Sequence, residues 1–179
     1  MRQLFIDTET TGLSPRHGHR VIEIACVEMV DGRLTGNDYH VYLDPERSVP
    51  AEAEAVHGLN DSFLLGQPLF SDVAPALMAF IADAHVLIHN APFDVRFFAA
   101  EFERINIIYS LLTCLDSITD TLTAFRKLHP GQSCALKKLC NYYDLGMPEG
   151  RWHSALTDAQ MLARLWSARA KTLSISIQI

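Results

Sequence analysis

The stretch that decides the fold is Phe5-Ile6-Asp7-Thr8-Glu9-Thr10-Thr11-Gly12-Leu13. Its apolar start predicts a buried strand, and because side chains alternate along a strand, Asp7 and Glu9 leave the same face. Buried like charges repel, so such a pair normally persists because a cation lies between its members. Carboxylate oxygens suit Mg²⁺ or Mn²⁺. Taken alone, the stretch also fits two solvated acids at the end of a strand.

The composition indicates one soluble globular domain. The chain has 179 residues, of which 49% are hydrophobic and 20% charged, enough to bury a sizeable core. No stretch approaches the roughly 20 apolar residues that span a bilayer. Met1-Arg2-Gln3 leads straight into the strand without an apolar signal region, so we expect a cytoplasmic protein. The four cysteines show no C-x-x-C pairing and are expected to be reduced and buried.

The charge is unevenly distributed along the chain. The net charge of -6 argues against a broad non-specific DNA clamp, yet residues 1–120 hold 7 Lys/Arg against 18 Asp/Glu, whereas residues 121–179 hold 8 against 3. A polyanion could therefore approach from the basic side of an acidic molecule.

The pattern of apolar residues predicts a mixed α/β protein. Residues 20–30 and 38–43 read as strands that form, with the first, three antiparallel strands. Residues 86–88 read as a further short strand. Helices are expected over residues 51–56, 70–83, 92–104, 116–128, 135–143 and 154–170. Residues 173–179 alternate as a strand does, and three roles stay open for them: pairing with the sheet, contact with a partner, or an unattached end.

Three further residues extend the acidic motif. Asp94 follows the strand 86–88 at the start of a helix, which is a usual place for an α/β site. His153 and Asp158 lie at the start of the last long helix and can point into one cleft. Four carboxylates can hold two divalent cations, which stabilise the attacking and leaving oxygens of a phosphodiester displacement. A histidine with a pKa near neutrality suits proton acceptance from water.

Three segments in this order resemble the exonuclease motifs of the DEDDh family. They are Phe5 to Leu13, the run His89-Asn90-Ala91-Pro92-Phe93-Asp94-Val95-Arg96-Phe97-Phe98, and the run His153-Ser154-Ala155-Leu156-Thr157-Asp158-Ala159. The resemblance covers about residues 3–168. It implies a ribonuclease H-like mixed β-sheet, with three antiparallel strands plus parallel strands, flanked by helices. It also implies removal of nucleotides from a 3′ end with two Mg²⁺ or Mn²⁺ ions.

The resemblance assigns roles residue by residue. Asp7, Glu9 and Asp158 would hold the ion that activates water, Asp7 would bridge to the second ion with Asp94 at its edge, and His153 would be the general base. Contacts to the terminal nucleotide would come from Thr10, Thr11, Leu13, His57, Asn90 and Phe93. His57 could equally end a helix, and Phe93 could equally belong to the core. Asp116 and Asp120 are expected to be acids at a helix start.

We therefore expect residues 1–172 to form an exonuclease domain, with a tail of unknown role at residues 173–179. The expected reaction is 3′–5′ hydrolysis of single-stranded DNA ends to nucleoside 5′-monophosphates, in proofreading or DNA repair. An exoribonuclease of the same family and a non-catalytic accessory subunit of a polymerase remain the alternatives. A replicative polymerase is an implied partner, although the chain shows no long tail of the kind that tethers proofreading members of the family. Ser154 follows the histidine where the family often has Gly or Asn, and it should be tolerated.

Overall fold

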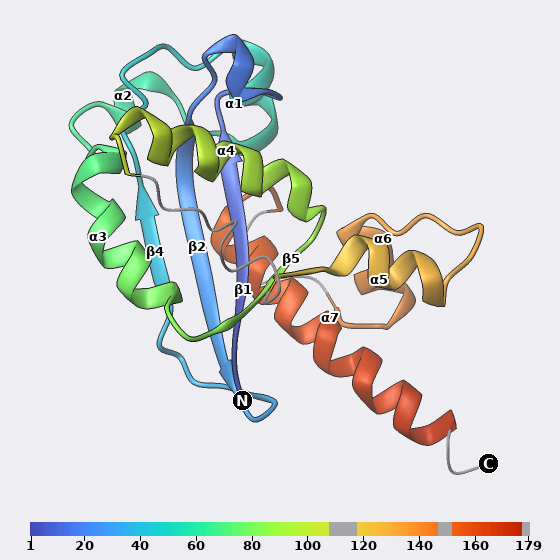
Figure 1. The fold of residues 1–179 in the computed structure, drawn as a ribbon. Coiled ribbons are helices and arrows are strands. Elements are labelled where there is room, and N and C mark those ends of the chain that lie inside the picture. Colours follow the sequence, from blue (N-terminus) through green and yellow to red (C-terminus); the bar gives the residue numbers. More distant parts are fainter. Residues whose placement is uncertain (108–117, 147–151, 177–179) are drawn as a thin grey trace.

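The computed structural model describes residues 1–107, 118–146 and 152–176, and the last seven of these by their backbone alone. These residues form six strands and several helices, arranged as Figure 1 shows. The strands are β1 (Arg2–Thr10), β2 (Val21–Val30), β3 (Arg33–Leu34), β4 (Tyr39–Tyr42), β5 (His85–Ile88) and β6 (Ile118–Asp120). The helices are η1 (Pro15–His17), α1 (Ala51–His57), α2 (Asp61–Leu64), α3 (Phe70–Ile81), α4 (Ala91–Arg104), α5 (Thr121–Leu128), α6 (Leu136–Tyr142) and α7 (Ala155–Ser176).

The strands form one mixed sheet in the order β3-β2-β1-β5-β6, and β4 also pairs with β2. β2 pairs antiparallel with β1, β3 and β4, whereas β5 runs parallel to both β1 and β6. The predicted three antiparallel strands plus parallel strands are therefore confirmed.

Alternation along β1 builds a core on each face of the sheet. Leu4 and Ile6 pack with α3 and α4 on one face, while Phe5 packs with α7 on the other. Figure 1 shows α3 and α4 in front of the strands and α7 behind them. Ala155, Ala159 and Ala163 recur every four residues on α7 and are fully buried. These small side chains line one face of the helix and let its backbone approach the sheet closely.

One prediction was wrong. The helix expected over residues 116–128 starts only at Thr121, because Ile118 to Asp120 form β6. Ile118 and Thr119 are β-branched residues that suit a pleated strand, and they pair in register with Val86 and Leu87 of β5. Asp120 is indeed the acid at the helix start, since its side chain accepts a hydrogen bond from the Leu122 amide. Asp116 lies outside the described residues.

The remaining predictions concern the last helix and the cysteines. The strand-like alternation after Leu173 does not produce a strand over residues 173–176, which continue α7. Cys26, Cys134 and Cys140 are buried free thiols, as expected, and Cys114 lies outside the described residues. None of the described helices is both long and apolar enough to cross a bilayer.

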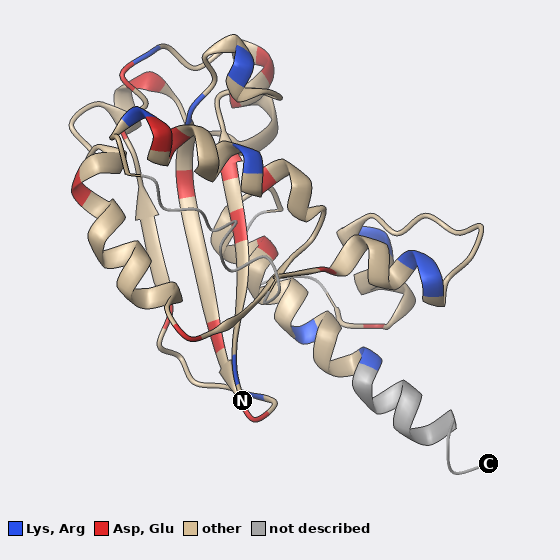
Figure 2. Ribbon diagram, viewed as in Figure 1, with Lys and Arg blue, Asp and Glu red and all other residues tan. Residues whose placement is uncertain are grey.

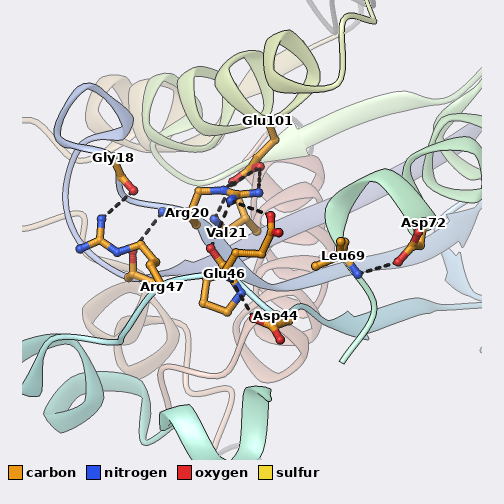
Figure 3. A network of polar contacts seen from close by, with 11 residues as sticks. Gly18, Arg20, Val21, Asp44, Glu46, Arg47, Leu69, Asp72 and Glu101 are labelled. Atoms are coloured by element: carbon orange, nitrogen blue, oxygen red, sulfur yellow. Dashed lines mark hydrogen bonds and ion pairs between the residues drawn. The ribbon is translucent and has the colours of Figure 1, made fainter. Parts of the chain in front are cut away.

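A buried ion pair fixes α4 against the beginning of β2 (Figure 3). Arg20 Nε donates to Glu101 Oε1 at 2.8 Å, and Arg20 Nη2 donates to Glu101 Oε2 at 2.9 Å. The Val21 amide donates to the same carboxylate at 3.1 Å. Glu101 is 1% exposed. Since α4 carries Asp94 at its other end, this contact helps to position the site described below.

We predict that Glu101→Ala destabilises the protein by about 3 kcal/mol, because it leaves the Val21 amide and the Nε and Nη2 donors of the Arg20 guanidinium without their carboxylate partner. Urea unfolding followed by circular dichroism would measure the change in free energy. Glu103→Ala, on an exposed position of the same helix, is the matched control and should change stability by less than about 0.5 kcal/mol. Equal effects of the two substitutions would contradict a structural role for the pair.

Candidate active site

The end of β1 and the starts of α4 and α7 meet at one cavity of about 680 Å³. The motif residues reach it from segments far apart in the sequence. Its lining includes Asp7, Glu9, Asn90, Phe93, Asp94, His153 and Asp158. The structure thus brings together all four acids and the histidine that the sequence singles out.

The alternation of β1 explains how these acids are divided. Asp7 and Glu9 continue the row of Phe5, which faces α7, and so they point toward the helix that carries Asp158. Thr8 continues the opposite row of Leu4 and Ile6, which faces α4. Its hydroxyl accordingly donates a 2.7 Å hydrogen bond to Asp94 Oδ1. The two faces of β1 therefore contribute side chains toward both helices of the site, α7 and α4.

The arrangement fits a divalent cation. One carboxylate oxygen each from Glu9 and Asp158 and one ring nitrogen of His153 lie within 4.8 Å of one another. Asp158 Oδ1 is buried and has no hydrogen-bond partner among the described residues. A buried carboxylate oxygen without a partner is costly, and a bound cation would satisfy it.

Burial and repulsion raise the pKa values of three of the acids. Desolvation, followed by the charges of Asp94 and Glu9, raises the pKa of Asp7 well above its usual value. Burial raises the pKa of Asp94 to about 7, although the hydrogen bond from Thr8 opposes this. Burial raises the pKa of Asp158 to about 6, while a hydrogen bond from the His153 backbone opposes it. A cation in the cavity would favour the ionised forms of all three.

Asn90, which precedes α4, and His153, which precedes α7, both have left-handed backbone conformations. His153 has φ of 61° and Asn90 has φ of 71°. Such conformations are uncommon for residues other than glycine, and they concentrate at functional sites. His153 is exposed immediately before α7, so its ring is accessible to solvent beside Glu9 and Asp158. Asn90 is likewise exposed, and its amide nitrogen donates to Asp120 Oδ1 at 3.1 Å.

A second cavity, of about 590 Å³, adjoins the first through Thr8, Glu9 and Phe93. Its walls include five of the residues expected to contact the terminal nucleotide, namely Thr10, Thr11, Leu13, His57 and Phe93. The Leu13 side chain is 80% exposed, whereas His57 is buried at the end of α1 and its Nδ1 accepts from the Leu59 amide at 3.1 Å. His57 therefore both ends helix α1 and lines the wall of the second cavity.

Thr10 and Thr11 are engaged within the turn. Thr10 Oγ1 donates to the Gly12 carbonyl at 2.7 Å. Thr11 is fully buried, its amide donates to the Arg20 carbonyl, and its hydroxyl accepts from the Arg20 amide at 3.0 Å. A Cβ atom on Gly12 would collide with the His19 ring, so a side chain at this position would displace that histidine. The polar groups of Thr11 thus shape the turn rather than point outward.

Glu23 is a residue that the sequence analysis missed. It lies opposite Glu9 in the β1–β2 register and is 1% exposed. Its Oε1 accepts from Ser154 Oγ at 3.1 Å and contacts His40 Nε2 at 2.8 Å. It therefore ties β2 and β4 to the segment that holds His153. Only the antiparallel register reveals this, since Glu23 belongs to no motif in the sequence.

Comparison with known proteins agrees with this geometry. A family model described as Exonuclease matches residues 4–166. The DNA polymerase III subunit epsilon of Escherichia coli is 43% identical over 171 residues, which cover 93% of this chain and 70% of that protein. The same subunit of Rickettsia felis is 40% identical over 166 residues, covering 93% and 72%. The structure of exonuclease X in complex with 5′ overhanging duplex DNA superimposes with a TM-score of 0.74 and 26% identity, covering 96% and 91%.

The ribonuclease H-like fold and the acidic cavity thus define a nuclease, and the chain belongs to the Exonuclease family. Its similarity to polymerase III epsilon subunits extends over most of its length. The prediction of a hydrolytic 3′–5′ exonuclease of the DEDDh type is confirmed by these comparisons.

We predict that Asp94→Asn makes the metal-free protein more stable at high pH. Because the folded pKa of Asp94, about 7, exceeds its usual value of 3.8, this carboxyl favours the fold below about pH 4 and loses that contribution as the pH rises through 7. An asparagine keeps the oxygen that accepts from Thr8 and carries no charge. At pH 8 in EDTA the variant should gain about 1 kcal/mol, or roughly 2–4 °C in Tm.

Thermal unfolding from pH 4 to pH 8 would measure this difference. The two proteins should differ least at the acid end and diverge as the pH increases. Asp83→Asn, at an exposed turn, is the control and should follow the wild-type profile. A constant difference between Asp94→Asn and wild type across the pH range would rule out titration of Asp94 as the cause.

Proposed function

We propose that this protein hydrolyses the terminal phosphodiester bond of single-stranded DNA 3′ ends and releases nucleoside 5′-monophosphates. The observation that carries the proposal is the cavity that gathers Asp7, Glu9, Asp94, His153 and Asp158 from β1, α4 and α7. The similarity to polymerase III epsilon subunits supports a role in proofreading, with a replicative polymerase as partner and the cytoplasm as location. We assign the activity to residues 1–172 and leave the role of residues 173–179 open.

The acids of the cavity would hold two Mg²⁺ or Mn²⁺ ions. Glu9, Asp158 and Asp7 would bind the first, and Asp7 would also reach the second, with Asp94 at its edge. When bound, such ions acidify water and stabilise the attacking and leaving oxygens of a phosphodiester displacement. This ligand set is supported by Asp158 Oδ1, which has no hydrogen-bond partner in the described part of the chain, and by the raised pKa values of Asp7 and Asp94.

His153 would act as the general base. Its ring is exposed at the mouth of the cavity, and one ring nitrogen lies within 4.8 Å of the Glu9 and Asp158 carboxylate oxygens. Neutral imidazole can accept a proton from the attacking water at that nitrogen, and the neighbouring carboxylates would stabilise the imidazolium. No nucleophilic side chain is required, so the reaction would proceed without a covalent intermediate.

The second cavity would hold the terminal nucleoside. Leu13 and Phe93 offer apolar and aromatic faces, on which any base can stack, and His57 completes the wall. The Asn90 side chain lines the catalytic cavity and would contact the nucleotide there. Thr10 and Thr11 would support this contact by holding the turn, since the Thr11 amide and hydroxyl are already engaged by Arg20.

We predict that Asp7→Ala abolishes turnover and that His153→Ala lowers kcat by about 10²–10⁴-fold, the usual contribution of general base catalysis. Oligonucleotides labelled at the 3′ or the 5′ end should show immediate release of the 3′ label as a mononucleotide and a shortening ladder from the 5′ label. EDTA should stop both. Far-UV circular dichroism would establish that the variants fold, and a folded, active Asp7→Ala protein would overturn the assignment.

We also predict faster turnover of DNA than of a matched RNA oligonucleotide. Selection between them depends on contacts to the 2′-OH, and the similarity to polymerase III subunits favours deoxyribose. Steady-state kinetics on the two substrates would measure the ratio of kcat/KM. A ratio that favours RNA would assign the protein to the exoribonucleases. Copurification with a polymerase but no cleavage of either substrate would favour the accessory-subunit alternative.

A further inference from the structure

The catalytic cavity has a second wall that the reaction itself does not use. This wall is formed by α5 and by the segment that joins α5 to α6. Arg126, Gln132 and Ser133 are exposed on this wall. Figure 2 shows acidic positions along β1 and β2 and basic positions on α5 and α6. The cavity therefore combines an acidic floor, formed by Asp7, Glu9, Asp94 and Asp158, with a basic wall that carries Arg126.

Arg126 is the only lysine or arginine among the described residues that line this cavity. Its guanidinium forms no hydrogen bond or ion pair with another described residue, in contrast to Arg20, which is bound to Glu101. An exposed guanidinium at the rim of a cavity is thus available to a ligand. Its five donors match the oxygens of a phosphate diester.

The helix that carries Arg126 is firmly held. Asp120 caps α5 and also accepts from the amide nitrogens of Asn90 and Ala91 at the start of α4. His89 contacts Thr121 Oγ1 at 3.0 Å and the Cys134 carbonyl at 2.9 Å. These contacts tie both ends of the basic wall to the end of β5. Arg126 is therefore presented from a scaffold that is anchored to the start of α4, the helix that carries Asp94.

We propose that Arg126, assisted by the Gln132 amide, binds a phosphate of the substrate strand on the 5′ side of the scissile bond. This inference rests on the proposed function, in which the second cavity holds the terminal nucleoside and the acids hold the scissile phosphate. Because Leu13 lines only the second cavity and Arg126 lines only the first, a strand that crosses the scissile site away from Leu13 would meet the basic wall. A cation there offsets the repulsion between a polyanion and a protein of net charge -6.

Two substrates separate this role from catalysis. The p-nitrophenyl ester of thymidine 5′-monophosphate carries the scissile bond but no further phosphate, whereas a single-stranded oligonucleotide carries both. For Arg126→Ala we expect kcat/KM on the oligonucleotide to fall about tenfold, mainly through KM, because a hydrogen bond to a charged group is lost. Hydrolysis of the ester should be unchanged. The slope of log KM against log salt should fall by about 0.7, the value for one single-strand phosphate contact.

A neutral methylphosphonate placed singly at each of the first three phosphates 5′ of the scissile bond locates the contact. At one of these positions the oligonucleotide should lose affinity for the wild-type protein, and Arg126→Ala should cause no further loss. Fluorescence anisotropy of a labelled oligonucleotide in EDTA measures the same coupling without turnover. The proposal would be overturned if, at all three positions, the loss of affinity from the methylphosphonate and the loss from Arg126→Ala simply added.

Two control variants remove one positive charge elsewhere. Arg33→Ala lies on β3 at the opposite edge of the sheet, and Lys127→Ala lies next to Arg126 but does not line the cavity. Both should keep most of the oligonucleotide activity. A loss for Lys127→Ala equal to that for Arg126→Ala would indicate a diffuse charge effect and overturn the contact. An equal loss on the ester and the oligonucleotide would also overturn it, whereas a wild-type protein inactive on both would refute the proposed function itself.

Discussion

The structure depends on the mutual repulsion of carboxylates that the fold forces into one cavity. Asp94 is buried and Asp7 is half-buried, and their pKa values are raised by loss of water and, for Asp7, by the neighbouring charges. Such a cluster lowers the stability of the metal-free fold at neutral pH, so the surrounding structure must hold it in place. Divalent cations bound between the carboxylates would relieve the same repulsion. The lower stability of the metal-free fold and the capacity to bind metal would therefore arise from the same arrangement of charge.

Contacts around the acids offset the loss of stability caused by their repulsion. The ion pair between Arg20 and Glu101 ties α4 to β2, and three buried alanines allow α7 to approach the sheet. Glu23 connects β2 to Ser154, next to the left-handed His153. Each contact acts on a different element that carries a site residue. The backbone of the site is thus determined by the packing around it, which is the condition under which strained positions persist at functional sites.

Much of this arrangement follows from the sequence because it is local. The alternation of apolar residues before Asp7 gives β1 its two faces, and the motif at Asp94 begins a helix directly after β5. Contacts between distant segments are not encoded in this way. Glu23 acquires its role from the β1–β2 register, and Ile118 becomes a strand only because β5 provides an edge to pair with. Thr11 similarly appears available in the sequence, yet the return of the chain at Arg20 occupies its polar groups.

The two walls of the catalytic cavity place opposite demands on the substrate. The acids require cations before a phosphate can approach, whereas Arg126 attracts the phosphate diester directly. If a nucleic-acid strand contacts only the acidic floor, the contacts of its terminal nucleotide must by themselves overcome the repulsion between phosphates and carboxylates. A strand that also reaches α5 gains a contact that does not depend on metal. Since that contact is to the backbone, it gains affinity without reading the bases. An enzyme that must remove any terminal nucleotide needs affinity of this kind, and the separation of charge between β1 and α5 provides it.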